Sequence, residues 1–373
     1  MKLCIWMNMP SHHQSALFRE IHNTDGIDLR VCYYNSITEK RIKLGWDKNT
    51  NLEWEYDIFE LNSIDSLIVD WKERIHVVPG LSSDFTKNLV NKLCSNNVKW
   101  IHWSEKSGVN FSRILGFNPI LTKILKPLFF FYKGYYSYGQ SINRNAIGAF
   151  AIGNSAKKDF YRWGVRPTKI RVVPYALDPL SHNAPPDFLS KKEFIEFLYV
   201  GSLEKRKGIS LLLRAFSQLE HRESKIKLRL VGKDYSSGRY KDLAKKLGVL
   251  EQVDFDGVIQ SKFINQVISN SDVFILPTLF DGWGAVLNEA TSLGKPIIST
   301  REAGASEHLV ESGVNGYIID SGSVEQLRIA MQSYIDNPNL IDEHGKYSLK
   351  IYKNIAPSNV ASLFIKSVRE LII

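Results

Sequence analysis

Short runs of apolar residues alternate with helix-like segments along most of the chain. The runs are rich in Val, Ile, Leu and aromatic residues and are bounded by polar residues, Gly or Pro, which is typical of buried strands. The segments between them place apolar residues at the three- and four-residue spacing of an amphipathic helix. This alternation predicts an α/β protein whose parallel sheets are covered by helices on both faces.

The alternation falls into two series, one in each half of the chain. In the first series we expect strands at 3–7, 29–34, 75–78, 100–103 and 149–152, with helices at 14–21, 85–93 and 157–163. Residues 36–73 are polar and irregular and predict no element. In the second series we expect strands at 194–200, 227–231, 253–255, 272–276, 296–299 and 316–319, with helices at 209–219, 240–247, 262–269 and 285–293.

Two series in 373 residues predict two doubly wound domains. Residues 174–186 are rich in proline and small residues and are the expected linker. We therefore expect one domain at 1–180 and a second at 187–355. Residues 356–373 form a last helical pattern that no strand follows.

Composition limits the class of protein. The chain is 44% hydrophobic and 23% charged, as in soluble globular proteins. Cys4, Cys32 and Cys94 lack the spacing of a metal site or a disulfide framework, which indicates a reducing compartment. The apolar run at the N-terminus is too short for a signal peptide, and no 18-residue apolar span follows. We expect a cytoplasmic protein without a transmembrane helix.

The net charge of +9 is concentrated in one segment, because residues 106–158 hold eight bases and no acid. Such a one-sided basic field favours anionic partners: a nucleic acid, a membrane surface or an acidic substrate. Within it, 118–136 predicts an aromatic, basic helix with an apolar face. Two interpretations stay open. In one, the element lies on an anionic bilayer and the protein is peripheral on the inner face of the plasma membrane; in the other, it is a core helix with a solvated basic face.

Two loops at expected carboxyl ends of strands carry groups that suit a phosphate ligand. In 200–209, Gly201 and Gly208 allow close backbone approach, and Arg206 and Lys207 supply two cations for a diphosphate. The other stretch, 277–296, reads PTLFDGWGAVLNEATSLGKP. It places a glycine turn before a helix N-terminus, which favours anions. Two carboxylates, Asp281 in the turn before the helix and Glu289 about one turn into it, bracket this anion site.

These segments together resemble glycosyltransferase family 4, the retaining, nucleotide-sugar-dependent enzymes of the GT-B fold. The similar stretches are GSLEKRKGISLLLRAF, LRLVGKD, VDFDGVI, DVFILPTLFDGWGAVLNEATSLGKPII, REAGASEHLVESGVNGYIID and, upstream, KIRVVPYALDP. They cover roughly residues 150–340 in the family's order. The resemblance implies two Rossmann-like domains facing a central cleft, with the last helix, 356–373, packing back on the N-terminal, acceptor-binding domain.

The resemblance also implies roles for particular residues. Lys207 would bind the donor diphosphate, Glu289 the ribose hydroxyls, and Asp281 would lie beside the transferred sugar, as would His102 of the first domain. The remaining donor-binding residues implied are Gly201, Ser202, Arg206, Val258, Ile259, Gly282, Trp283, Gly284, Ala285, Val286 and Leu287. His12, His13 and Glu105 are candidates for the acceptor side. The alternative for His102 is a core histidine, and for the two other histidines an exposed polar loop.

The chain departs from the family's pattern at informative positions. Asp281 stands where the family has Glu, and Ser202 where it has Arg, so Arg206 is the candidate for the missing cation. The family's N-terminal glycine pair is absent. The role of Asp281, as nucleophile or as positioning group, stays open. No Asp-x-Asp metal site appears at a suitable strand end, so we expect no cofactor and no metal.

The resulting hypothesis is a glycosyltransferase that moves a hexose-type sugar from a nucleotide-diphosphate donor to a saccharide or lipid-linked saccharide, in bacterial polysaccharide, lipopolysaccharide or glycolipid synthesis. The alternatives are a nucleotide-sugar epimerase or phosphorylase on the same fold, and a non-catalytic nucleotide-sugar-binding protein. A nucleic-acid-binding protein is disfavoured because the basic run is local and no nucleic-acid motif is present. No GxGxxG follows the first strand, which argues against a nicotinamide or flavin dinucleotide.

Overall fold

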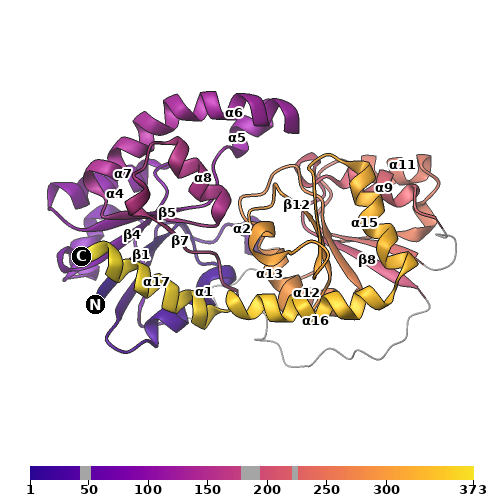
Figure 1. The fold of residues 1–373 in the computed structure, drawn as a ribbon. Helices are drawn as coiled ribbons and strands as arrows, with labels where there is room; N and C mark the ends of the chain where they lie inside the picture. Colours follow the sequence, from indigo (N-terminus) through magenta and orange to yellow (C-terminus); the bar gives the residue numbers. More distant parts are fainter. Residues whose placement is uncertain (43–51, 178–193, 221–225) are drawn as a thin grey trace. The chain divides into compact units, whose positions relative to one another are not determined.

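The computed structural model describes residues 1–42, 52–177, 194–220 and 226–373, which form two compact units (Figure 1). Unit 1 comprises Met1–Ser107, Ile124–Leu177 and Ile355–Ile373. Unit 2 comprises Gly108–Lys123 and Asp178–Asn354. Most of the expected linker, from residue 178 onward, lies outside the described residues. No helix in the described part of the chain is long and apolar enough to cross a membrane.

Unit 1 is built on a parallel sheet, which among the described residues has seven strands in the order β3-β2-β1-β4-β5-β6-β7. The strands are β1 (Lys2–Met7), β2 (Asp28–Tyr33), β3 (Glu55–Asp57), β4 (Ile75–Pro79), β5 (Trp100–Ser104), β6 (Gly148–Ala151) and β7 (Ile170–Val172). Its helices include α1 (His12–His22), α4 (Asp84–Ser95), α7 (Gln140–Asn145), α8 (Asn154–Arg162) and α17 (Pro357–Ile372), with single turns at α2 (Glu39–Ile42) and α3 (Ile64–Leu67). Helix α5 (Val109–Ile114) belongs to unit 2, and α6 (Pro119–Gly134) begins in unit 2 and continues in unit 1.

Different helices cover the two faces of this sheet. On one face, Trp100 belongs to the core cluster that includes buried residues of α4, α7 and α8. On the other, Phe364 of α17 packs edge-on against Trp103 and Phe150, with ring centroids 5.8 and 5.1 Å apart. α17 also packs on α1. The expectation that the last helix returns to the first domain is confirmed.

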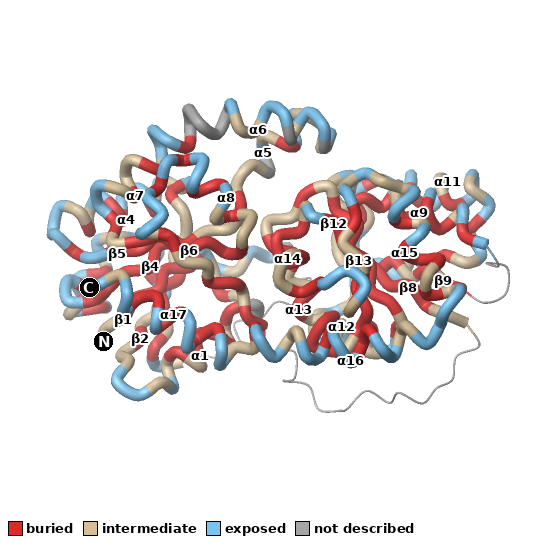
Figure 2. The backbone as a smooth tube through the Cα atoms, viewed as in Figure 1, coloured by how far each residue is buried: buried red, intermediate tan, exposed pale blue. Residues whose placement is uncertain are grey.

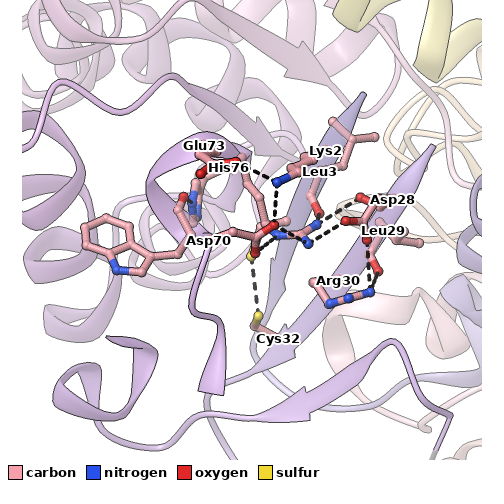
Figure 3. Close-up of polar contacts among 12 residues, drawn as sticks. Lys2, Leu3, Asp28, Leu29, Arg30, Cys32, Asp70, Glu73 and His76 are labelled. Carbon is pink, nitrogen blue, oxygen red and sulfur yellow. Dashed lines mark hydrogen bonds and ion pairs between the residues drawn. The ribbon is translucent and has the colours of Figure 1, made fainter. Parts of the chain in front are cut away.

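A buried arginine, Arg74, links the amino ends of the central strands. Figure 3 labels its partners Leu3, Asp28 and Asp70. Arg74 Nη1 donates to the carbonyls of Leu3 and Asp28 at 3.3 and 3.0 Å, and its other nitrogens reach the carboxylates of Asp28 and Asp70 at 2.7 and 2.8 Å. Burial alone would raise the pKa of Asp70, but the hydrogen bonds from Arg74 and Lys2 outweigh it and lower that pKa to about 2. These charged side chains therefore pair with one another at the amino ends of the strands, away from the carboxyl ends.

Two of the three cysteines, which are far apart in the sequence, lie close together in the structure. Cys4 on β1 and Cys32 on β2 are buried free thiols whose sulfurs lie 3.4 Å apart. Cys94 is a half-buried free thiol on α4.

Unit 2 is built on a second parallel sheet, which over the described ranges has six strands in the order β10-β9-β8-β11-β12-β13. The strands are β8 (Ile195–Val200), β9 (Ile226–Val231), β10 (Val253–Gly257), β11 (Val273–Leu276), β12 (Ile297–Thr300) and β13 (Gly316–Ile319). The helices are α9 (Ile209–Ser217), α11 (Arg239–Lys246), α12 (Ser261–Ser269), α13 (Val286–Ser292), α14 (Ser306–Leu309), α15 (Val324–Asp336) and α16 (Asn339–Asn354). α9 packs on α11 and α15, whereas α13 packs on α12, α14 and α16.

Candidate donor site

Strands β8 and β11 are neighbours in the sheet of unit 2, although two strands separate them in the sequence. The chain runs outward from β8 to β9 and β10, and then returns to place β11 on the other side of β8. This reversal is a topological switch point, where open parallel sheets bind ligands at the carboxyl ends of their strands. The two loops singled out by their sequence, 201–208 and 277–285, follow these two strands.

The two loops contact each other directly. The carbonyl of Arg206 accepts hydrogen bonds from the Leu279 amide at 2.7 Å and from the Thr278 hydroxyl at 3.0 Å. Gly208 has a φ of +74°, and a Cβ there would lie 2.0 Å from the Pro277 carbonyl oxygen. The close approach that the sequence predicts for Gly208 is therefore an approach between the two loops.

Two cations and two carboxylates meet where the loops touch. Lys207 forms an ion pair with Asp281, and both side chains are largely buried, at 13% and 14% exposed. Arg206 Nη1 lies 4.0 Å from the same carboxylate oxygen and donates to the Phe280 carbonyl at 3.0 Å. Arg206 Nη2 donates to Glu204 at 2.8 Å. The structure thus brings Arg206, Lys207 and Asp281 together.

Ser202 takes part in the same network. Its hydroxyl donates to Glu204 Oε1 at 2.7 Å, the oxygen that also accepts from Arg206. Burial opposes ionisation of Glu204, but hydrogen bonds from Ser202 and the charges of Arg206 and Lys207 lower its pKa. Sequence reasoning missed Glu204, and the signal was the serine two residues earlier, at a position where the related pattern has arginine.

The glycine turn before α13 is held by its own side chains. Trp283 is buried, and its indole Nε1 donates to Asn288 Oδ1 at 2.8 Å. Gly284 adopts a φ of +89°. The loop after β12 supports the turn, because the Asp281 amide donates to the Glu302 carbonyl at 3.0 Å and the Ala305 amide to the Trp283 carbonyl at 2.8 Å. Asn288 and Glu302 were not singled out by their sequence.

Helix α13 begins directly after this turn. The amides of Leu287 and Asn288 bond to the carbonyls of Gly284 and Ala285, so the amides of Ala285 and Val286 precede these first bonds. The carboxylate of Glu289 lies in the first turn of α13 and is half-buried. Burial raises the pKa of Glu289 to about 7. No residue within the described ranges hydrogen-bonds or pairs with this carboxylate.

The other predicted donor residues lie on the same sheet edge. Gly201 follows β8, and a Cβ on it would meet the Tyr199 hydroxyl at 2.7 Å. Val258 and Ile259 follow β10, the edge strand, and Val258 is exposed.

The predicted residues of the first domain are described within unit 1. His102 is buried, its Nε2 lies 3.0 Å from the Ser104 hydroxyl, and its ring packs edge-on against Phe160 and Trp163. Burial lowers the pKa of His102 to about 3, so its imidazole is neutral at pH 7. Glu105 interacts with the hydroxyl of the half-buried Tyr175.

The two other histidines, His12 and His13, begin α1, and their side chains lie outside the described part of the structure. In the described residues, no three His, Cys, Asp or Glu side chains are grouped as a metal site.

Comparisons with known proteins find glycosyltransferases. A family model described as glycosyl transferases group 1 matches residues 182–351. An uncharacterized glycosyltransferase of Haemophilus influenzae is 28% identical over 156 residues, which are 42% of this chain and 44% of that protein. The capsular polysaccharide biosynthesis glycosyltransferase CapM of Staphylococcus aureus is 27% identical over 165 residues, 43% of this chain and 42% of that protein. The matches thus span less than half the length of these relatives.

Solved structures extend the likeness of the fold to both units. The chain matches the lipopolysaccharide outer core galactosyltransferase WaaB with a TM-score of 0.71 and 17% identity, covering 99% of each chain. It matches Anabaena Alr3699/HepE in complex with UDP with a TM-score of 0.72 and 16% identity, covering 99% of this chain and 100% of that one. The predicted GT-B fold class is confirmed.

Proposed function

We propose that the chain transfers a sugar from a nucleotide-diphosphate donor to an acceptor hydroxyl, because the family model of glycosyl transferases group 1 matches residues 182–351. The observation that carries this proposal is the meeting of Lys207, Arg206 and Asp281 at the β8–β11 switch point, next to α13. A nucleotide sugar contains a diphosphate, ribose hydroxyls and a sugar. The site contains the two cations, the carboxylate of Glu289, which has no partner among the described residues, and the carboxylate of Asp281.

Stabilising the departing diphosphate is the first chemical task. Lys207 and Arg206 lie against Asp281, and a diphosphate entering there offers both cations additional acceptor oxygens. The amides of Ala285 and Val286 have no backbone partner among the described residues, and we assign them to the phosphates, together with the backbone of Gly201 and Ser202. With two cations in place, we propose that transfer needs no metal and no cofactor.

Holding the sugar and ribose is the second task. We assign the ribose hydroxyls to Glu289, and the transferred sugar to Asp281 and the backbone of Gly282, Trp283 and Gly284. The proposal has three further parts. Transfer retains the anomeric configuration, the transferred sugar is a hexose, and His102 lies beside that sugar. His102 would act as a neutral imidazole, because burial lowers its pKa to about 3.

The proposal also extends to the acceptor. CapM is named for capsular polysaccharide and WaaB for the lipopolysaccharide outer core, which supports a saccharide or lipid-linked saccharide acceptor here. The basic segment 106–158 supports an acceptor met at an anionic membrane surface. We therefore place the protein in the cytoplasm, peripheral on the inner face of the plasma membrane.

A thermal-shift and calorimetric screen of nucleotide diphosphates and their sugars tests the donor site. We expect one nucleotide diphosphate to bind, and Lys207→Ala to weaken it about 10- to 100-fold because a charged hydrogen bond is lost. Lys245→Ala on α11, an exposed lysine outside this site, is the matched control and should bind as the wild type does.

Transfer is then measured with the donor that the screen identifies. Asp281→Asn should keep donor binding and lose turnover. Unchanged nucleotide affinity in both Lys207→Ala and Glu289→Gln would rule out this donor site. Donor binding without hydrolysis or transfer to any saccharide would favour a non-catalytic binder, and isomerised donor would favour an epimerase.

A further inference from the structure

The apolar face of helix α6 lies on the side of the helix opposite to its contact with α8. The apolar residues of its first two and a half turns are exposed in the described structure, and Figure 2 shows the labelled helix with much of its described part coloured as exposed. They are Ile120, Leu121, Ile124, Leu125 and Leu128. At about 100° per residue they lie within an arc of about 140° on one side of the helix. Leu128, at 73% exposed, and Ile124, at 59%, are central to this apolar face.

The opposite side of α6 faces inward through a charge. Lys126 Nζ pairs with Asp159 at 3.2 Å, and Asp159 is only 1% exposed. Asp159 also accepts from the amide and hydroxyl of Ser107 at 2.9 and 3.0 Å and from Arg162 at 3.0 Å. A lysine is therefore used to anchor α6 to α8, while its leucines and isoleucines face outward. Amphipathic helices of globular proteins have the reverse orientation.

The segment of the chain that contains the apolar face carries one sign of charge. Residues 106–158 contain no acid, so nothing in this segment opposes approach to an anionic surface. Ile114, on the preceding helix α5, is a further exposed apolar residue, and Arg113 next to it is an exposed base. An apolar stripe flanked by bases is the arrangement of helices that lie in the interface of anionic bilayers.

We propose that the outward apolar face of α6 inserts into the interfacial layer of an anionic lipid bilayer. The inference deepens the proposed function, on which it rests for the lipid-linked acceptor. Of the bases in 106–158, Lys126 contributes little to lipid binding, because it is paired with Asp159. Insertion of Ile124 and Leu128 holds the protein on the surface, and the remaining bases attract it there.

Flotation with vesicles of phosphatidylglycerol and phosphatidylcholine tests this inference. We expect the wild type to float with anionic vesicles and the double variant Ile124→Glu with Leu128→Glu to lose about tenfold or more of its binding, because two acids replace inserted side chains. The matched control, Ile329→Glu with Leu349→Glu, changes two other exposed apolar residues, on α15 and α16, and should float as the wild type does.

A probe on the helix separates insertion from attraction. A Leu128→Cys variant in a Cys94→Ser background, labelled with an environment-sensitive dye, should show a blue shift with vesicles. Part of the binding should persist at roughly 0.5 M salt, where screening removes most of the attraction between surface charges. Absence of vesicle binding overturns the inference, as does binding that salt abolishes without any dye shift. Self-association of the wild type that the Glu variant abolishes, without vesicle binding, would assign the face to a second copy.

Nucleotide binding without vesicles keeps the two proposals distinguishable. The Ile124→Glu, Leu128→Glu variant should bind the nucleotide diphosphate as the wild type does. If no nucleotide binds to either protein, the donor-site proposal fails while the flotation result still decides the membrane contact.

Discussion

At the scale of single residues, the proposed ribose site depends on the carboxylate of Glu289. It lies in the first turn of α13, in a half-buried position, without a side-chain partner among the described residues. Burial disfavours its charged form and raises its pKa to about 7. A carboxylate that accepts two ribose hydroxyls must be ionised, because the protonated form offers a donor where an acceptor is needed.

Nucleotide affinity is therefore expected to rise with pH. Between pH 6 and pH 8 the ionised fraction of a group with a pKa near 7 grows about tenfold, and the association constant should grow by about the same factor. Isothermal titration across this range measures it. Glu289→Gln should bind more weakly at pH 8 and retain only the dependence that the nucleotide phosphate itself contributes. An equal pH dependence in both proteins would remove Glu289 from the ribose site.

At the scale of elements, the proposed donor site depends on how closely the loop after β8 approaches the loop after β11. Gly208 meets the Pro277 carbonyl, and Gly304 meets the Gly282 carbonyl, where added Cβ atoms would lie at 2.0 and 2.3 Å. These glycines allow the backbone contacts that place Lys207 against Asp281. Sequence reasoning identified Gly208, but not the carbonyl that requires it, because that contact is between loops about seventy residues apart in the chain.

Replacing Gly208 by alanine should therefore reduce donor binding. The substitution costs about 1–2 kcal/mol for a Cβ at positive φ and adds a clash with backbone, so the two loops must separate. We expect at least about a tenfold loss of nucleotide affinity, as for a displaced charged hydrogen bond. Gly248→Ala is the control: its φ is +70°, with nothing within 4 Å of the added Cβ. It should lose stability only, and equal losses of affinity in both variants would contradict the argument.

At the scale of the whole molecule, the sequence predicts the two sheets well because strands of parallel sheets are buried on both faces. The expected strands of both series appear in the structure. Strand β3 was not predicted, since Glu55–Asp57 is three residues long and has no buried position. The orientation of α6 was also beyond the sequence, because an apolar stripe looks the same whether it faces a core or the outside.

The prediction of site residues was limited in the same way, because the sequence does not show which face of an element is covered. The residues of the donor loops follow from local motifs, so Arg206, Lys207 and Asp281 were identified and do come together. His102 was singled out in the sequence at a strand end, but its burial against Phe160 and Trp163 depends on which face of β5 carries α8. Alternation along a strand that is apolar on both faces does not reveal that choice.

The buried imidazole of His102 makes the stability of unit 1 depend on pH. Its folded pKa of about 3 lies below the ordinary value of 6.5, so the unfolded chain binds the proton first. The stabilising contribution is complete above pH 6.5 and is lost as the pH falls toward 3, by about 1.4 kcal/mol per unit. At pH 5 the loss is about 2 kcal/mol relative to pH 7.5.

Urea unfolding followed by amide hydrogen exchange in β5 measures this dependence within unit 1. His102→Gln should be less stable at pH 7.5, because the side chain packs less well against Phe160 and Trp163. The difference from the wild type should shrink by about 2 kcal/mol at pH 5, since glutamine takes up no proton. A difference that stays constant between pH 7.5 and pH 5 would mean that His102 is protonated in the folded protein as readily as in the unfolded chain.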